Sequence, residues 1–363
     1  MKLPSLNSLV QSAWQTFKRF PLGILFAIVG SIILINIVSL PYDRKDNIDY
    51  LWKMVMTCYL GMLLFIAISI YRGRKNFTFK KVILINLVGI IFITAYYLSL
   101  PVSITTIASL RLVLFALGLH LLISFVPYLL RNEINGFWQY NKILFLRFLT
   151  SSLYTIVLYL GLILAVFAVD NLFKVSFDGN IYAYIWIALA GIFNTWFFLA
   201  GIPKNFSALE TNHEYPKGLK IFTQYVLLPL TTLYLVILYA YGMKIITDGE
   251  WPEGWVSYLV IGFSIGGILS LLLIYPIRNI EENKWVLFFS RIFYIALFPL
   301  IIMLYFAIKR RINDYGITEA RYFVMILAIW LLLIALYFLF SKQKNIKLIP
   351  ISLCVFALMI TYG

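Results

Sequence analysis

Apolar runs of about 20 residues recur along the whole chain, with short polar stretches between them. A run of this length crosses the hydrocarbon core of a bilayer when it is coiled as an α-helix. Because lipid offers no hydrogen bonds, the backbone of each run must satisfy itself as a helix. The sequence therefore predicts an all-α fold, a polytopic transmembrane helix bundle of about eleven spans. The expected spans are 22–40, 51–70, 82–100, 107–130, 148–169, 181–201, 221–243, 256–277, 286–308, 322–340 and 346–361.

Composition supports a lipid environment and excludes one class of partner. Hydrophobic residues make up 62% of the chain and charged residues 12%, whereas a soluble domain carries about 25% charged residues. The net charge of +15 would suggest nucleic acid in a soluble protein. The cations, however, fall in clusters between apolar runs rather than along one amphipathic face. We therefore expect membrane lipids with anionic headgroups on the cytoplasmic face as partners, and no nucleic acid.

The residues before the first span form a separate segment, 1–21. Its apolar residues recur at three- and four-residue steps: Leu3, Leu6, Val10, Trp14 and Phe17. This spacing predicts a short cytoplasmic helix at the membrane interface, and a disordered tail is the alternative. The remainder, 22–363, is expected to form a single transmembrane helical domain.

The distribution of cations predicts the orientation, because Lys and Arg are retained on the cytoplasmic side. Alternate connections hold 20 of the 30 cations: Lys2, Lys18, Arg19, Arg72, Arg74, Lys75, Lys80, Lys81, Arg131, Lys142, Arg147, Lys204, Lys217, Lys220, Arg278, Lys284, Arg291, Lys342, Lys344 and Lys347. The other connections are acidic: Asp43, Asp46, Asp49, Asp170, Asp178, Asp248, Glu250 and Glu253. The amino terminus is therefore predicted to be cytoplasmic, and Gly363 to lie on the outer side.

One connection departs from this distribution. Lys309, Arg310, Arg311 and Arg321 fall on the predicted outer side, within 13 residues of one another. Either the number of helices before them is off by one, or these cations are held there for a reason. A structural explanation is also available, since cations at the carboxyl end of the ninth helix complement its dipole, and Asp314 and Glu319 can pair with them locally.

Two ionisable residues lie within the fourth span and are candidate functional groups, because charge in hydrocarbon must be compensated. His120 is near the middle of the span, and Arg111 precedes it by about two and a half turns. His120 could titrate, bind a ligand or relay a proton. The alternative is a neutral His120 that donates to Asn86 or Asn194 on a neighbouring helix. Arg111 is expected to extend to the outer interface or to meet an acidic residue there.

Motifs of known enzymes are weak in this chain. Residues 262–266 match a G-x-S-x-G string, but they lie inside an apolar run, where Gly262 and Gly266 are better read as a helix-packing surface. The two histidines fall in different regions and both cysteines lie in apolar runs, so no metal ligand set is predicted. We therefore predict no catalytic residue, cofactor or metal site, and an enzyme is the less favoured class.

Two polar stretches carry a resemblance to a known family. They read YPKGLKIF at 215–222, which includes Lys217, and RINDYGITEARY at 311–322. Together with the Lys18–Pro21 segment and the His120 helix, they resemble a bacterial family of multi-pass membrane proteins catalogued as domain of unknown function 4153. The resemblance implies a protein of the bacterial inner membrane and supplies no catalytic residues. It also implies an extramembrane region after the last helix, so we expect this chain to be truncated or a short form.

The same stretches have a direct physical interpretation. Pro216 to Gly218 predict a turn that starts the seventh helix, and Gly316 followed by Thr318 predicts a turn and then the N-cap of the tenth. Polar loops between apolar spans are also where a partner is recognised. The candidate functional polar residues are Arg111, His120, Lys217, Arg310, Arg311, Asp314, Tyr315, Glu319 and Arg321.

Three functions are compatible with these observations. The first is a non-enzymatic envelope anchor or sensor that presents the stretch 309–321 to an envelope protein partner. The second is a transporter or channel for a small solute or ion, which would use His120, Arg111 and the spans interrupted by Pro229 and Pro299. The third is an intramembrane enzyme that acts on lipid-linked substrates.

Overall fold

The computed structural model describes residues 5–41, 48–75, 77–249, 255–277, 284–341 and 344–361. Throughout these residues the regular secondary structure is helical, which confirms the all-α prediction. Several residues used above lie outside the described ranges: Lys2, Leu3, Asp43, Asp46, Glu250, Glu253, Arg278, Lys342 and Gly363.

Ten helical stretches of the described chain are long and apolar enough to cross a membrane. They are Pro21–Ser39, Asp49–Arg74, Phe79–Ser99, Thr106–Tyr128, Ile134–Phe173, Ile181–Ala200, Lys217–Asp248, Val256–Ile277, Trp285–Tyr315 and Glu319–Phe340. The eleventh expected span is helix α14, Leu348–Ile360, whose 13 residues are fewer than the roughly 20 of a straight span. The chain is thus a multi-pass membrane protein of ten long spans and one shorter apolar helix.

The helices pack as two compact units, Met1–Thr211 with Pro350–Gly363, and Asn212–Ile349. The expectation of one transmembrane domain over 22–363 stays a prediction, because a membrane domain can contain two packed units. The first unit holds the following elements: α1 Leu6–Arg19, α2 Pro21–Ser39, α3 Asp49–Arg74, α4 Phe79–Ser99, α5 Thr106–Phe125, η2 Val126–Tyr128, α6 Ile134–Phe173, α7 Ile181–Ile187, η3 Ala188–Phe193, α8 Asn194–Ala200, η4 Ser207–Leu209 and most of α14.

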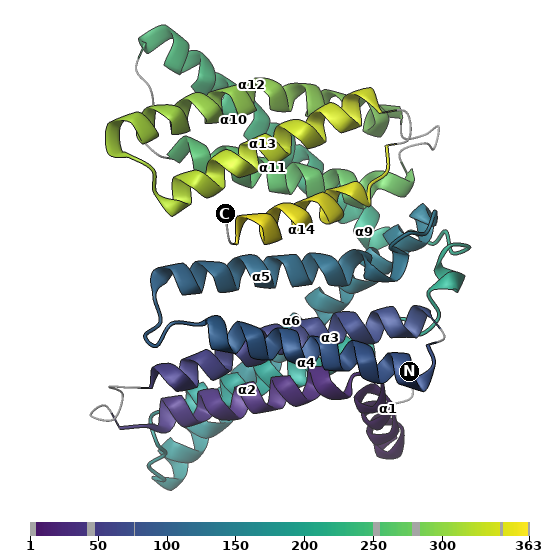
Figure 1. The fold of residues 1–363 in the computed structure, drawn as a ribbon, viewed down its shortest axis with the longest axis vertical. Helices are drawn as coiled ribbons and strands as arrows, with labels where there is room; N and C mark the ends of the chain where they lie inside the picture. The colour runs from purple at the N-terminus through teal and green to yellow at the C-terminus, as the bar shows by residue number, and fades with distance from the viewer. Residues whose placement is uncertain are drawn as a thin grey trace. The chain divides into compact units, whose positions relative to one another are not determined.

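Helix α3 is central to the first unit and packs against α2, α4 and α5 (Figure 1). Small residues allow the close approach of α2, because a Cβ added to Gly30 would lie 3.1 Å from the Cβ of Cys58. Helix α14 packs on α5 in the same way: the thiol of Cys354 donates to the carbonyl of Gly118 at 3.2 Å. Both cysteines are free and buried, in keeping with their apolar runs.

Helix α1 confirms the helix expected before the first span and excludes a disordered tail for residues 6–19. The side chain of Ser5 caps its first turn through the amide of Ser8 at 3.3 Å. At its other end, Arg19 donates to the carbonyls of Ile202 and Pro203 at 2.6 and 2.5 Å, which attaches α1 to the segment after α8. Leu9, Val10 and Trp14 are exposed, as an interfacial helix requires. Its place at the interface stays a prediction.

The second unit contains α9 Lys217–Ile221, η5 Phe222–Leu227, α10 Leu228–Asp248, α11 Trp255–Ile274, η6 Tyr275–Ile277, α12 Lys284–Tyr315 and α13 Glu319–Phe340. Helix α12 packs against α10, α11 and α13. The sequence predicted a packing surface on α11 at Gly262 and Gly266, and this choice of residues is wrong. A Cβ added at Gly262 or Gly266 would meet nothing within 4 Å among the described atoms, whereas one at Gly267 would overlap the ring of Phe293. The close contact between α11 and α12 therefore lies at Gly267, which faces the large ring of Phe293.

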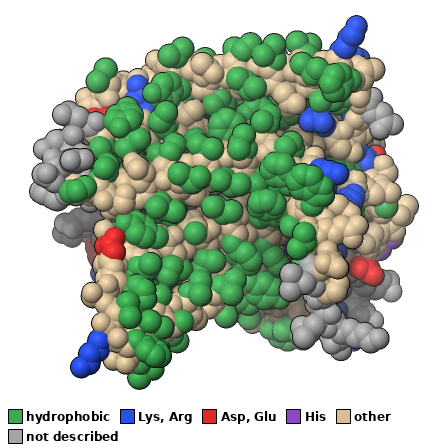
Figure 2. Space-filling view, turned by 90° about the horizontal axis from the view of Figure 1, so that it is seen from below, with side chains coloured by type: hydrophobic (Ala, Val, Ile, Leu, Met, Phe, Trp, Pro, Cys, Tyr) green, Lys and Arg blue, Asp and Glu red, His purple; other side chains and the backbone are tan. Residues whose placement is uncertain are grey.

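Successive long helices run in opposite directions, so their connections alternate between the two ends of each unit (Figure 1). In the first unit, the connections that carry Lys75, Arg131 and Lys204 therefore share one end. Figure 2 shows hydrophobic side chains across the middle of one face of the molecule, with Lys and Arg side chains towards its two ends and more of them at one end. This is the surface expected of a membrane protein. Which end faces the cytoplasm stays a prediction.

Candidate functional site

The stretch 309–321, which we call the α12–α13 tip, is mainly helical rather than a loop. Helix α12 continues to Tyr315, and α13 begins at Glu319 after a connection of three residues. Its last turn contains no basic residue, so the proposed complement of the helix dipole by residues 309–311 is wrong. The cations lie more than one turn before the helix end, where the dipole is weak.

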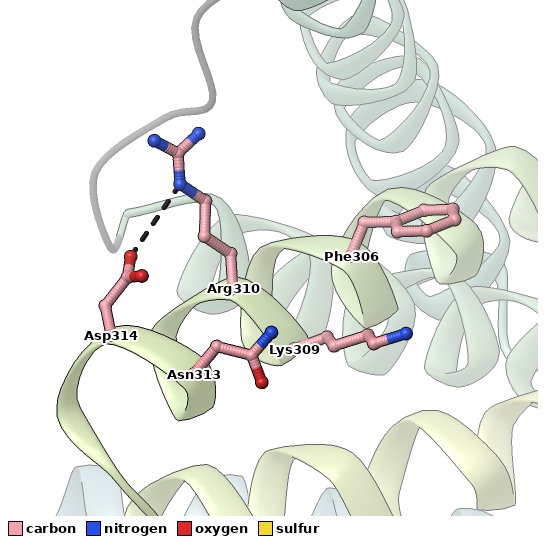
Figure 3. Close-up of a pocket in the computed structure, with 5 residues that line it drawn as sticks. All are labelled: Phe306, Lys309, Arg310, Asn313 and Asp314. Carbon is pink, nitrogen blue, oxygen red and sulfur yellow. Dashed lines mark ion pairs between the residues drawn. The ribbon is translucent and has the colours of Figure 1, made fainter.

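Local pairing at the tip is confirmed for one acid. The guanidinium Nε of Arg310 lies 3.7 Å from Oδ2 of Asp314, one helical turn further on (Figure 3). Both side chains remain more than half exposed, at 57% and 51%. Glu319 makes no ion pair with a described residue. A shallow pocket of about 250 Å³ lies beside the pair, lined by Phe306, Lys309, Arg310, Asn313 and Asp314.

The turn between α12 and α13 matches the sequence prediction in its backbone. Gly316 has a φ of +76°, which a residue with a Cβ adopts only with strain. Thr318 occupies the N-cap of α13, although its side chain makes no capping hydrogen bond. Arg321 donates to the carbonyl of Gly316 at 2.6 Å and lies over the ring of Tyr315, 5.5 Å from the centroid. Arg321 therefore stabilises the turn between α12 and α13 through its contacts with Gly316 and Tyr315.

Apolar side chains are exposed at this tip. Tyr315 is 75% exposed and Ile317 is 70% exposed. They stand beside Lys309, Arg310 and Asp314, which are exposed as well. An exposed aromatic and an exposed aliphatic side chain rimmed by charge is the composition of a protein interaction surface.

His120 and Arg111 are not brought together with each other. Nine residues of helix separate them, or about 13 Å along the axis of α5. The Nδ1 atom of His120 lies 2.8 Å from the carbonyl oxygen of Ala116 in its own helix, so the expected bond to Asn86 or Asn194 is wrong. The imidazole ring packs beside Tyr59, with ring centroids 6.4 Å apart.

Lys217 lies at the other end of the second unit from the tip. It begins α9 directly after Pro216, as the sequence predicts. The hydroxyl of Tyr215 donates to the carbonyl of Leu273 at 3.2 Å, which places the start of α9 beside the end of α11. Burial raises the pKa of Tyr215, so its hydroxyl remains a donor. The structure therefore does not combine Lys217 with Arg310, Arg311, Asp314, Tyr315, Glu319 and Arg321 into one site.

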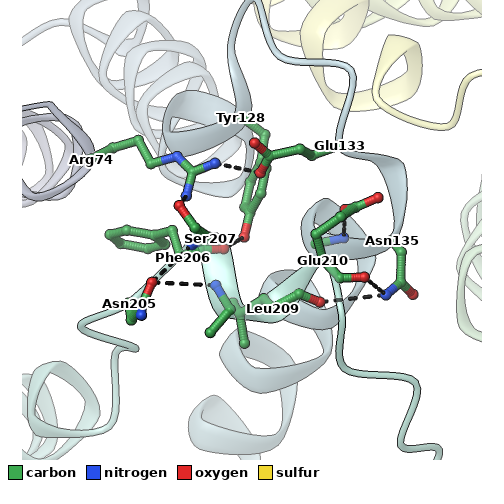
Figure 4. Close-up of polar contacts among 11 residues, drawn as sticks. Arg74, Tyr128, Glu133, Asn135, Asn205, Phe206, Ser207, Leu209 and Glu210 are labelled. Atoms are coloured by element: carbon green, nitrogen blue, oxygen red, sulfur yellow. Dashed lines mark hydrogen bonds and ion pairs between the residues drawn. The ribbon is translucent and has the colours of Figure 1, made fainter.

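A buried polar network in the first unit was missed from the sequence. Arg74, at the end of α3, forms an ion pair with Glu133 and donates to the hydroxyl of Ser207 at 2.7 Å (Figure 4). Its guanidinium also lies over the ring of Tyr128, 5.4 Å from the centroid. The Tyr128 hydroxyl donates to the carbonyl of Phe206 at 2.9 Å. Three segments far apart in the sequence are thus joined around one arginine.

The same network starts helix α6. The carboxylate of Glu210 accepts from the amide of Gly136 at 2.5 Å, in the first turn of the helix. Asn135 donates to the carbonyl of Glu210 at 2.7 Å. A Cβ at Gly136 would come within 2.9 Å of the Tyr128 ring, so glycine is needed there. These contacts explain why α6 begins at Ile134 and not near 148 as expected.

A signal for this network was present in the sequence. Glu133 and Glu210 are carboxylates in connections that otherwise carry cations, so each has opposite charges nearby. That pattern predicts local pairing, but not which cation is the partner. Nowhere in the described ranges do three or more His, Cys, Asp or Glu residues cluster as a metal site would need.

Comparison with known proteins adds one relative and one family. The relative is the uncharacterized protein PM1469 of Pasteurella multocida, 28% identical over 141 residues. The match covers 38% of this chain and 23% of the relative, so the chain matches less than a quarter of that protein's length. No solved structure matches. The model of the domain of unknown function DUF4153 matches residues 19–362, and the chain therefore belongs to the DUF4153 family of membrane proteins.

Proposed function

We propose that this protein is a non-enzymatic anchor or sensor of the bacterial inner membrane that presents the α12–α13 tip to an envelope protein. The observation that carries the proposal is the exposure of Tyr315 and Ile317 among charged side chains. Aromatic and arginine side chains contribute most of the binding energy in protein interfaces.

The charge of the tip indicates the chemistry of the partner. Four cations, Lys309, Arg310, Arg311 and Arg321, stand against the two acids Asp314 and Glu319. An acidic protein surface complements this balance and is steered towards it. The distribution of cations along the chain predicts that the tip lies on the outer side of the membrane, where an envelope protein would reach it.

The test uses the full chain in its native membrane, with a photo-crosslinking amino acid in place of Tyr315. We expect a crosslinked protein of defined mass, and we expect Arg310→Gln with Arg311→Gln to reduce its yield at least about fivefold, since two interfacial charges are removed. The matched control is Lys217→Gln with Lys220→Gln at the other end of the unit, which should leave the yield unchanged. Crosslinks to lipid alone, or a protein crosslink insensitive to Arg310 and Arg311, would refute the proposal.

A transporter is the second candidate, and a groove beside His120 is the observation that bears on it. A groove of about 460 Å³ lies between α3 and α5 and includes Tyr59, whose ring packs beside His120. Its polar lining consists of Asp49, Ser109 and the Tyr59 hydroxyl, and the rest is apolar or aromatic. Such a groove fits an apolar chain better than a hydrated solute. The tip therefore remains the better supported site.

A further inference from the structure

A cavity of about 420 Å³ opens in the second unit, where α11 ends, α12 begins and the chain leaves α13. This volume lies within the range of small-molecule sites. Tyr275 follows the end of α11, Ser290 and Arg291 lie in the second turn of α12, and Lys344 follows α13. The cavity is thus built by three helices that meet at one end of the bundle, opposite the α12–α13 tip.

The polar part of the lining is cationic. Arg291 and Lys344 are its charged residues, and the described lining contains no carboxylate. Lys344 has a φ of 41°, in the left-handed region that residues other than glycine rarely adopt. The hydroxyl of Ser290 donates to the carbonyl of Val286 at 2.8 Å, so the charge of the described lining comes from the two cations. An anion with several acceptor oxygens matches this set.

The rest of the lining is mainly apolar or aromatic. Leu271 and Leu272 come from the last turn of α11, Ile295 lies one turn after Arg291 in α12, and Leu339 is at the end of α13. Tyr294 and Phe338 close the wall between α12 and α13, with their rings stacked 5.0 Å apart at an angle of 6°. The cavity therefore combines two cations with a wall that is mostly hydrocarbon.

The position of the cavity identifies the kind of molecule that combines these two chemistries. It opens at the end of the unit that the cation distribution predicts to be cytoplasmic, at the depth of the lipid headgroups. Basic pockets between transmembrane helices on this side are suited to phosphorylated headgroups. A soluble anion would leave the apolar lining unused, and a neutral lipid would make no use of the positive charge of Arg291 and Lys344.

We propose that this cavity binds one anionic phospholipid. Its phosphate lies between Arg291 and Lys344, and an acyl chain lies along Leu272, Ile295 and Phe338. This site is independent of the partner proposed for the α12–α13 tip, because it lies at the other end of α12 and uses different residues.

The test counts lipids retained by the purified full chain in detergent, by native mass spectrometry. With added phosphatidylglycerol we expect one tightly retained lipid, and with phosphatidylcholine none. Arg291→Gln with Lys344→Gln should weaken retention of phosphatidylglycerol roughly tenfold, because each cation near the headgroup adds to the affinity. Lys309→Gln with Arg310→Gln is the matched control on the same helix, and it should retain the lipid as the unchanged chain does.

Two further experiments distinguish binding in this cavity from nonspecific attraction of lipid to a charged surface. Ser290→Phe fills the cavity and leaves both cations in place, so it should also reduce retention, whereas attraction to a charged surface would be unaffected. Excess inorganic phosphate should leave the lipid bound, because phosphate lacks the acyl chain. The proposal is overturned if the Arg291 and Lys344 variant retains as much lipid as the control, if Ser290→Phe has no effect, or if phosphate alone displaces the lipid.

Discussion

The described part of the chain contains two Arg–carboxylate pairs whose settings are opposite. Arg74 and Glu133, in the first unit, are 6% and 25% exposed and join segments 59 residues apart. Arg310 and Asp314, in the second unit, are 57% and 51% exposed and are four residues apart on one helix. The pair in the first unit thus connects distant segments of the fold, whereas the pair in the second unit stays accessible to solvent.

The difference follows from desolvation. A guanidinium removed from water must recover its hydrogen bonds within the protein. Arg74 recovers hydrogen bonds from Glu133 and Ser207 and lies over the ring of Tyr128, while its buried Nε has no hydrogen-bond partner among the described residues. Arg310 keeps much of its hydration, so its pairing with Asp314 adds little to stability and is readily exchanged for another partner. Burial therefore distinguishes a pair that holds the fold from one that can bind.

Breaking the buried pair should have the largest effect on stability. Arg74→Met leaves the Glu133 carboxylate and the Ser207 hydroxyl without this partner, and we expect a loss of about 2–3 kcal/mol in the free energy of unfolding. The measurement is thermal unfolding of the purified protein in detergent. A double variant with Glu133→Leu should lose less than the two single variants together, because no lone charge remains. Equal and additive losses would mean that the pair is not coupled.

The matched substitution in the exposed pair should change the free energy of unfolding only slightly. Arg310→Met is expected to cost no more than about 0.5 kcal/mol, as for other surface pairs one helical turn apart. High salt should remove this small difference, since the pair is screened, and should leave the Arg74→Met difference nearly intact. A loss at Arg310 as large as that at Arg74 would contradict the contrast between the two pairs.

The helices could be predicted from the sequence because hydrocarbon imposes one solution on each apolar run. All eleven expected runs are helical, and the main error is the start of α6. Residues 134–147 contain Asn135, Gln139 and Lys142, which resemble a loop in sequence. In the structure Gln139 and Lys142 are buried, and Lys142 donates to Gln139 at 2.5 Å. Polarity along the chain cannot show that such groups satisfy one another.

The sites were less accessible to sequence reasoning, because they depend on which helix ends meet. The residues of the α12–α13 tip were identified, although as a loop. His120 was assigned a partner on another helix, whereas its own backbone supplies one. Arg74, Arg291 and Lys344 entered only as cations that orient the chain. Their roles depend on Glu133 and on the lining of a cavity, which are contributed by other segments.

The central claim is the predicted membrane orientation, and it is tested most directly by finding the side on which Lys75 and Tyr315 lie. Lys75 and Tyr315 are exposed at ends predicted to face opposite sides of the membrane, and the native Cys58 and Cys354 are buried. Single variants Lys75→Cys and Tyr315→Cys would be treated with a membrane-impermeant maleimide in sealed spheroplasts. We expect Tyr315→Cys to be labelled at once, and Lys75→Cys only after the membrane is permeabilised. Labelling of both in sealed spheroplasts, or of Lys75→Cys alone, would contradict the account.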